Sequence, residues 1–501
     1  MMLYNKEFIV FTLKIIGNTL QFGYYEIHLL QCAVMLRRKI YDKIMDWKSR
    51  EHKPLVLKGP RQVGKTFILK HFAEENYAHC YYIDFTRDSD AKRAFNDSLD
   101  VDTIVRSLNI NRPKIPIEPK KTLIILDEIQ DCPRADQSLK SFAEDGRYDV
   151  VASGSLLGLN NYTLRRKDHS DESIPLTPIG QTEELILRSM DFEEFLWAAG
   201  LTDDAISPLK DSLRNRTAIE ESWLQSFSKL YRDYLIVGGM PDAVNAFFQT
   251  GLFSKASEAQ DRILSRHQAD ITKYNSPKEA ERIRNVLRSL PGQLSMDGKK
   301  FTFSRITDDT DTNANLTKYF WALEWIRNAG YANMCYNVRS PTHPLESQVK
   351  YDDFKLYITD TGLLMRMMGP NAAEAIYYGD ISYNMGAVAE NAVAEAILKN
   401  GLPVRYYRKT GGEDRMELDF LIERGRSMIA IEVKSGRSRK SPSLNKAEKV
   451  FKFDRRIKFG KTNVFEDDNG VENYPLFACA FINEIVPRGE IDFGDYPDYM
   501  M

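Results

Sequence analysis

Apolar runs that end in glycine, serine or carboxylate residues recur through the first half of the chain. The run at 54–58 predicts a short buried strand, and the pattern at 67–72 predicts the first turns of a helix. Strands are also predicted at 81–85, 122–126 and 149–155. The run at 122–126 is apolar on both faces, as a central strand of a parallel sheet is. The pattern therefore predicts an α/β fold with a parallel sheet.

The second half of the chain changes character. Residues 190–248 have helical periodicity, and Asp191 is a suitable N-cap for their first helix. Helices at 279–290 and 316–329, followed by strand-like runs at 331–338 and 354–359, predict a winged helix. A further helix at 385–399 precedes two alternating strands, 416–422 and 428–434. We expect a second α/β unit there.

These changes in hydrophobic pattern and charge along the chain predict six segments. They are an N-terminal extension (1–34), an α/β core (35–190), a helical lid (191–269), a winged-helix-like domain (270–369), a second α/β domain (370–465) and an acidic tail (466–501). In the extension, Lys14, Gln21 and Glu26 interrupt the apolar stretch, so no membrane span is predicted. Two interpretations stay open, a signal anchor or an upstream extension of a protein that begins near Met35.

Composition narrows the class of protein. A chain of 501 residues predicts two to four domains, and 43% hydrophobic with 28% charged residues is typical of a soluble globular protein. The net charge of -2 gives the whole molecule no preference for a polyanion or a membrane. Five cysteines lie far apart without a C-x-x-C pair, which argues against disulfides or a zinc site and predicts a cytoplasmic location.

The clearest chemical motif is G-x-x-x-x-G-K-[ST], the loop that wraps the phosphates of ATP or GTP. Its residues are the predicted nucleotide-binding set: Gly59, Pro60, Arg61, Gln62, Val63, Gly64, Lys65 and Thr66. The loop stands between a predicted strand and a predicted helix, where backbone N–H groups and the helix dipole favour an anion. Lys65 is predicted to reach the β- and γ-phosphates, and the Thr66 hydroxyl to bind Mg²⁺.

A second signature follows about 60 residues later. Asp127 and Glu128 end the apolar strand at 122–126, so both carboxylates are expected at the carboxyl edge of the sheet. Asp127 is predicted to hold the hydrated Mg²⁺, and Glu128 to polarise the attacking water.

The strand at 149–155 ends beside the same edge. Ser153 and Ser155 are both candidates for a polar group next to the γ-phosphate, and the sequence does not choose between them. Arg165 and Arg166 follow in a predicted loop, where either an arginine finger or a solvated charge fits the pattern.

The C-terminal unit carries its own candidate site. Period-2 alternation places Asp419 on one face of its strand, and Glu432 and Lys434 on one face of the next. Glu390 lies on the apolar stripe of the helix at 385–399, where an unpaired carboxylate is costly. Asp419, Glu432 and Lys434 are predicted catalytic residues, and Glu390, Asp419 and Glu432 predicted Mg²⁺ ligands. An ordinary cross-strand ion pair is the alternative.

This constellation resembles the PD-(D/E)XK nuclease core, with Leu418 in place of the proline before the aspartate. The net positive charge of residues 401–461, with 17 Lys and Arg against 8 Asp and Glu, would favour binding of a polyanion. Residues 465–501 are acidic, with 1 Lys or Arg against 9 Asp and Glu. The acidic segment is interpreted either as a mask for a nucleic-acid surface or as a solvated tail. Basic residues of the winged-helix segment, among them Arg282 and Lys318, fit nucleic-acid phosphates or a solvated helix face equally.

The whole chain from 35 to 461 resembles AAA+-type P-loop ATPases with a C-terminal domain of unknown function 4143. The likeness is carried by KGPRQVGKT (58–66), LDEIQ (126–130), SGS (153–155), FEEFL (192–196), GGMP (238–241), KLYITDTGLL (355–364) and EVKS (432–435). The resemblance implies an ATPase domain, a winged-helix middle and a nuclease-like end.

The leading hypothesis is an ATP-binding hydrolase, with Mg²⁺ as cofactor, whose nucleotide state controls a DNA-binding, nuclease-like C-terminal half. The catalytic residues of the ATPase site would be Lys65 and Glu128. The alternatives are a nucleotide-dependent switch with an inactive nuclease fold and a winged-helix regulator. ATP and nucleic acid are the expected partners, no membrane is expected, and a homo-oligomer is left open.

Overall fold

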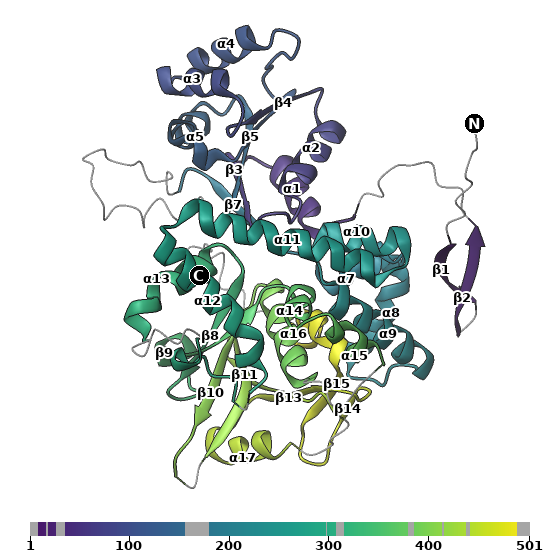
Figure 1. Cartoon of the computed structure of the whole chain (residues 1–501). Helices are drawn as coiled ribbons and strands as arrows, with labels where there is room; N and C mark the ends of the chain where they lie inside the picture. The colour runs from purple at the N-terminus through teal and green to yellow at the C-terminus, as the bar shows by residue number, and fades with distance from the viewer. Residues whose placement is uncertain are drawn as a thin grey trace.

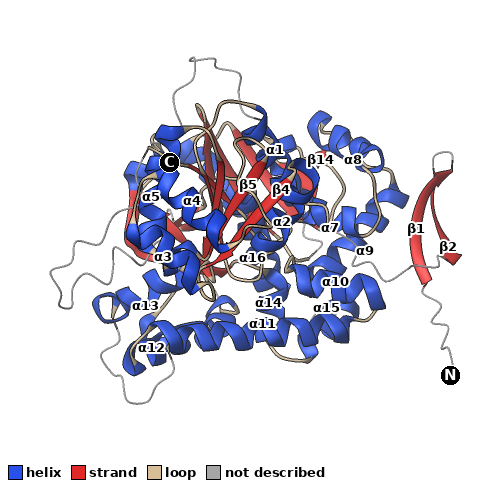
Figure 2. Cartoon of the chain, turned by 90° about the horizontal axis from the view of Figure 1, so that it is seen from above, coloured by secondary structure: helices blue, strands red, loops and turns tan. Residues whose placement is uncertain are grey.

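The computed structural model describes residues 36–155, 180–296, 298–306, 315–378, 385–412, 415–436 and 441–487, together with the backbone of 9–16 and 19–26. Arg165 and Arg166, and the last fourteen residues of the predicted acidic tail, lie outside these ranges. Within the N-terminal extension, β1 (Ile9–Ile16) and β2 (Thr19–Glu26) form an antiparallel hairpin at the edge of the molecule. The hairpin lies on the side of helices α8 (Asp203–Asn215) and α9 (Glu221–Val237) (Figures 1 and 2).

The first body is built on a parallel sheet with strand order β4-β5-β6-β3-β7. Its strands are β3 (Leu55–Gly59), β4 (His79–Asp84), β5 (Thr122–Asp127), β6 (Asp149–Ser155) and β7 (Glu183–Ile186). All four pairings are parallel, which confirms the predicted α/β class with a parallel sheet. β6 separates β3 from β5, so the phosphate loop and the Asp127 strand end at the same edge one strand apart.

Alternation along the strands explains why helices cover both faces (Figure 1). Leu123 and Ile125 pack on the side of α1 (Lys39–Ser49) and α2 (Lys65–Asn76). Ile124 and Leu126 pack on the other side, in the core that also contains buried residues of α3 (Ser89–Asp97), α4 (Val101–Asn111) and α5 (Pro133–Asp145). A strand that is apolar on both faces is thereby fully buried.

Helices connect this body to the next. They are α7 (Phe192–Ala198), α8 (Asp203–Asn215), α9 (Glu221–Val237), α10 (Pro241–Thr250), α11 (Phe253–Tyr274), α12 (Pro277–Leu294) and α13 (Leu316–Asn328). Asp191 caps the start of α7 as the sequence predicts, and the structure adds a capping box with Glu194. In Figure 1, α11 crosses the molecule between the five-stranded sheet above and the second body below.

The second body holds a mixed sheet with strand order β14-β15-β13-β12-β11-β10-β8-β9. The strands are β8 (Ala332–Val338), β9 (Val349–Ile358), β10 (Arg405–Lys409), β11 (Met416–Arg424), β12 (Ser427–Val433), β13 (Arg455–Gly460), β14 (Phe465–Glu466) and β15 (Glu472–Pro475). Its helices are α14 (Thr361–Met367), α15 (Asn371–Tyr378), α16 (Met385–Lys399), α17 (Pro442–Phe451) and α18 (Ile482–Ile485).

Strands β8 and β9 correct the prediction of a separate winged-helix domain over 270–369. The expected hairpin exists, but β8 pairs in parallel with β10, where Arg405 lies opposite Tyr336. The hairpin is therefore the edge of the eight-stranded sheet and not a free wing. Local periodicity predicts a strand and its faces, whereas the partner across about 70 residues is set by tertiary packing.

The predicted boundary of the acidic tail at residue 466 is also wrong. Residues 465–485 supply β14, β15 and α18, and Phe477 and Phe481 pack around the ring of Phe192 with centroids 6.5 and 6.4 Å away. Glu472, one of the acidic residues, is buried against Arg455 at 2.7 Å. The negative net charge of the segment led to the prediction of a tail, although its apolar side chains belong to the hydrophobic core.

None of the helices in the described part of the chain combines the length and apolar character that a membrane crossing requires.

Candidate functional site

The phosphate loop turns tightly between β3 and α2. Gln62 and Gly64 both have left-handed backbone angles, with φ of +67° and +95°. A Cβ on Gly59 would lie 2.3 Å from the carbonyl oxygen of Leu187, so only glycine fits where the loop leaves the strand. Arg38 donates to the Val63 carbonyl at 3.0 Å and braces the far side of the loop. The loop is thus held open with its first helical residue, Lys65, at the base of α2.

Lys65 is buried at the centre of this loop. Its Nζ donates to the carbonyl oxygens of Gly59 and Pro60, each at 2.9 Å. Burial lowers the pKa of Lys65 to about 8, although Glu128 and Asp127 favour the charged form. Phosphate oxygens beside Nζ would stabilise the ammonium much more than these carbonyls do. A nucleotide is the partner that this buried amine fits.

Asp127 lies directly across from the loop. Its Oδ2 accepts hydrogen bonds from the Thr66 hydroxyl at 2.8 Å and from the Tyr82 hydroxyl at 2.7 Å. The hydroxyl of Ser153 donates to the other carboxylate oxygen. A threonine hydroxyl facing a carboxylate is the oxygen donor set that Mg²⁺ prefers, so these residues fit the ion. Ser155 lies instead opposite Gly59 in the register of the sheet.

Glu128 leaves β5 in a left-handed conformation, with φ of 52°. Its backbone N–H donates to Asp127 Oδ1 at 3.1 Å, and its carboxylate accepts from the side-chain amide of Gln130. The negative charge of Glu128 partly offsets the lowering of the Lys65 pKa by burial, so the two side chains are close enough to interact electrostatically. The structure therefore brings together Lys65, Thr66, Asp127, Glu128 and Ser153.

The sequence did not predict two contacts of this site. The first is the hydrogen bond from Tyr82 to Asp127. Tyr82 lies on β4, whose register with β5 places Asp84 opposite Asp127, and the residue pattern of β4 does not indicate that Tyr82 contacts the site. Arg61 leaves the loop to pair with Asp270 of α11 at 2.9 Å and donates to the Tyr274 hydroxyl at 2.6 Å. A helix about 200 residues later thus holds the phosphate loop, which no local pattern could reveal.

Glu390 anchors the C-terminal cluster. It is buried on α16, with Lys355 Nζ 3.0 Å from its Oε1 and with further donors from Tyr357 and Lys299. Burial opposes ionisation, but Lys355 and Lys299 hold the pKa of Glu390 down at about 2. Lys355 also pairs with Glu417 at 2.9 Å. The sequence analysis gave Lys355 no role, and its signal was a single charge within the otherwise apolar run 354–358 at the end of β9.

The other members of the cluster do not complete a metal site. Asp419 accepts from the backbone N–H of Val433 at 2.8 Å, and Glu432 pairs with Lys434 at 2.7 Å. Across the described residues, no three His, Cys, Asp or Glu side chains are placed to hold a metal ion. The expected convergence of Glu390, Asp419 and Glu432 on one Mg²⁺ is therefore not what the structure presents. Ammonium groups surround Glu390 instead.

The pKa of Asp419 gives a pH prediction. Burial, with the charge of Glu390, raises it to about 6 from the usual 3.8. The folded state then holds more protons than the unfolded state between pH 4 and 6, so the free energy of unfolding falls as pH rises through this window. We expect Asp419→Asn to remove about 1–2 kcal/mol of that fall.

The measurement is urea unfolding of both proteins at pH 4.5 and pH 7. Asp211→Asn is the matched control, because Asp211 pairs with Arg214 on the exposed face of α8. An unchanged pH dependence in Asp419→Asn would show that Asp419 is ionised like an ordinary surface carboxylate.

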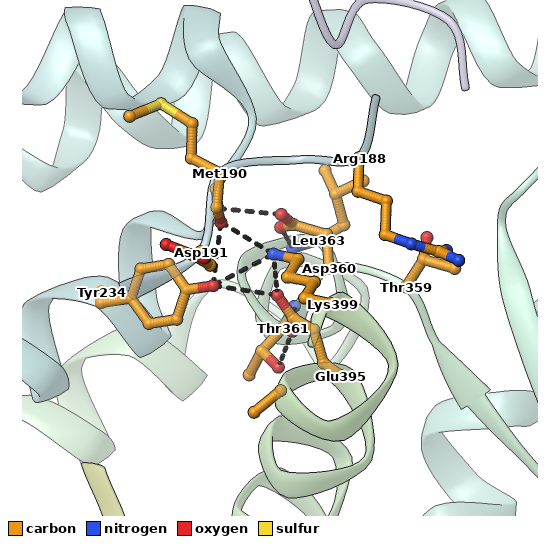
Figure 3. A network of polar contacts seen from close by, with 12 residues as sticks. Arg188, Met190, Asp191, Tyr234, Thr359, Asp360, Thr361, Leu363, Glu395 and Lys399 are labelled. Atoms are coloured by element: carbon orange, nitrogen blue, oxygen red, sulfur yellow. Dashed lines mark hydrogen bonds and ion pairs between the residues drawn. The ribbon is translucent and has the colours of Figure 1, made fainter. Parts of the chain in front are cut away.

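A polar network joins the two bodies (Figure 3). The Asp360 carboxylate accepts from the Gly239 N–H at 2.8 Å and caps α14 at Leu363. The Met190 carbonyl accepts from Lys399 Nζ at 2.7 Å and from the Tyr234 hydroxyl at 3.0 Å. The Gly239 position admits no side chain, since a Cβ would lie 2.0 Å from the Met190 oxygen. The motifs at 238–241 and 355–364 thus meet in one network.

Residues 51–196 match the model of an AAA domain. This match spans the phosphate loop and the Asp127–Glu128 strand end, and it supports a P-loop ATPase domain. Residues 228–374 match a domain of unknown function (DUF8612), and residues 385–477 match a domain of unknown function (DUF4143). The expected domain 4143 is thereby confirmed.

The chain was also compared with solved structures and with curated protein sequences. The Walker-type ATPase PABY2304 of Pyrococcus abyssi is similar with a TM-score of 0.40 and 15% sequence identity, over 66% of this chain and 96% of that one. No curated protein sequence matches the chain. The DUF8612 match runs from 228 to 374 and so spans the boundary that the sequence predicted at 269/270.

Proposed function

We propose that this protein binds ATP with Mg²⁺ in the AAA domain and hydrolyses it. The contact between the Thr66 hydroxyl and Asp127, at 2.8 Å beside the buried Lys65, carries the proposal. Lys65 and the backbone of residues 59–66 would hold the phosphates, Thr66 and Asp127 would hold the Mg²⁺, and Glu128 would orient the attacking water. Bound Mg²⁺ supplies charge neutralisation for the transferred phosphoryl group.

We further propose that the nucleotide state reaches the C-terminal body. Two contacts support this: Arg61 of the loop pairs with Asp270 of α11, and Gly239 is fixed by Asp360. DNA binding and cleavage by the C-terminal body, with Asp419, Glu432 and Lys434 as the reacting groups, stay predictions. The ion pairs of Glu390 with Lys355 and Lys299 favour the second candidate, a switch that uses an inactive nuclease fold as a docking surface.

The test is steady-state ATP turnover of the full chain with Mg²⁺ or with excess chelator, each with and without duplex DNA. We expect phosphate release that depends on Mg²⁺ and stops with chelator. Stoichiometric ATP binding without turnover under all four conditions would exclude the hydrolase and leave the switch. Incubation of DNA and RNA with Mg²⁺ and the same protein tests the nuclease prediction separately, with Glu432→Ala as the inactive comparison.

A further inference from the structure

A cavity of about 230 Å³ lies behind the phosphate loop, between the two bodies. Pro60, Arg61 and Val63 line it from the loop, and Thr359 and Lys399 line it from the C-terminal body. The residues of the predicted nucleotide site that point toward the phosphates, such as Lys65 and Asp127, are not among the described residues that line it. It is therefore a separate space on the outer side of the loop.

Both carboxylates that line this cavity, Asp360 and Glu395, accept hydrogen bonds. Asp360 accepts from two backbone N–H groups, those of Gly239 and Leu363. Glu395 accepts from the Thr361 N–H at 2.7 Å, and also from Tyr234 and Lys399. Lys399 neutralises Glu395, whereas Asp360 has only N–H donors, and neither acid forms an ion pair with Arg188 among the described residues.

Arg188 is a cation of the wall without an ion-pair partner among the described residues. Across the described part of the chain, its guanidinium has neither a carboxylate partner nor a hydrogen bond, and burial alone lowers its pKa. Its backbone is fixed, because the Arg188 carbonyl accepts from Arg38 at 2.6 Å. In Figure 3 its side chain points away from the polar network, toward Thr359. A half-buried guanidinium in a cavity wall attracts an anion.

His267 is the second unsatisfied group. It lies on α11 with only 7% of its surface exposed, and within the described residues its Nε2 has no hydrogen-bond partner. Its ring stacks on Tyr331 with centroids 3.9 Å apart, which fixes its orientation. Burial, with the charge of Arg61, lowers the pKa of His267 to about 3, so the ring is neutral at pH 7 and offers one N–H donor.

We propose that this cavity binds a small anion of the carboxylate or phosphate class, with Arg188 as its charged partner and His267 in the wall beside it. The space holds several water molecules or a small organic anion, but it is smaller than most pockets for drug-sized ligands. This site is additional to the proposed nucleotide site, and it shares the phosphate loop with it through Arg61.

The test uses the full chain labelled with ¹⁵N-histidine, since seven histidines give few signals to resolve. The chain is first saturated with Mg²⁺ and a non-hydrolysable ATP analogue, and is then titrated with inorganic phosphate in one arm and succinate in the other. We expect a saturable shift of the His267 resonance with at least one probe. Arg188→Gln should raise the dissociation constant at least about tenfold, and Arg188→Lys only a few-fold.

Arg327→Gln is the matched control, because Arg327 also lines the cavity but is paired with Glu324. Lys65→Ala, titrated with the same probes without nucleotide, should bind them like the wild type, which separates this site from the phosphate loop. Absence of a saturable shift with both probes would overturn the proposal, as would equal affinities in wild type and Arg188→Gln. If the ATP analogue fails to bind but the Arg188-dependent shift persists, the nucleotide proposal fails and this one stands.

Discussion

Glu128→Gln should bind ATP as tightly as the wild type and hydrolyse it at least about 100-fold more slowly. The glutamate is positioned by the sharp left-handed turn at the end of β5 and by its contact with Gln130. Glutamine keeps the shape and the size of the side chain but cannot polarise a water molecule as a carboxylate does. The substitution leaves Lys65 and Thr66, which are proposed to hold the phosphates and the Mg²⁺, in place.

The measurement pairs phosphate release with equilibrium ATP binding. Glu144→Gln serves as the control, since it makes the same chemical change on the exposed face of α5, where Glu144 faces Lys140 at 3.7 Å. Retention of more than half of the wild-type turnover in Glu128→Gln would remove Glu128 from the catalytic site and require another base.

Lys355→Met should destabilise the folded protein by about 3–5 kcal/mol. The Lys355 side chain is 1% exposed and lies 3.0 Å from Glu390 and 2.9 Å from Glu417. Its removal leaves the buried Glu390 with Lys299 as its remaining cation and the partly exposed Glu417 with Arg408, and a buried charge with less compensation is costly. Methionine fills a similar volume, so the loss is one of charge and not of packing.

Urea unfolding at pH 7 measures this effect. Lys300→Met is the matched control, because Lys300 pairs with Asp353 at 3.1 Å while its side chain is 43% exposed, so its loss should cost less than about 1 kcal/mol. Adding Glu390→Gln to Lys355→Met should restore part of the stability, since it removes a buried charge that only Lys299 would still balance. Equal effects of the two lysine substitutions would show that the Lys355 cluster does not stabilise the fold.

The nucleotide core could be predicted in detail because its signals are local. Glycine at 59 and 64 marks the loop, and the apolar run at 122–126 marks a strand that ends in Asp127. The structure places both at one sheet edge, with Lys65 as the first residue of α2. Such features depend on neighbours within a few residues, so pattern and structure agree.

The second body was predicted less well because its contacts are distant in sequence. The alternation in β8 and β9 identified strands, but their place at the edge of an eight-stranded sheet follows from pairing with β10. Lys355 reaches Glu390 from another element, so an expected metal cluster became a set of ion pairs. The acidic character of 466–485 likewise concealed the buried Phe477. The positions of the β8–β9 hairpin, Lys355 and Phe477 all depend on contacts with residues distant in sequence.

The central claim is that Lys65 and Asp127 form one pocket for Mg²⁺ and ATP. The most direct measurement is the equilibrium binding of Mg²⁺·ATP to the wild type, Lys65→Ala and Lys58→Ala. Lys58 is the control because it pairs with Glu184 at 2.6 Å outside the loop. We predict that Lys65→Ala weakens binding by about 100-fold while Lys58→Ala binds like the wild type. Equal binding by Lys65→Ala and the wild type would contradict the account.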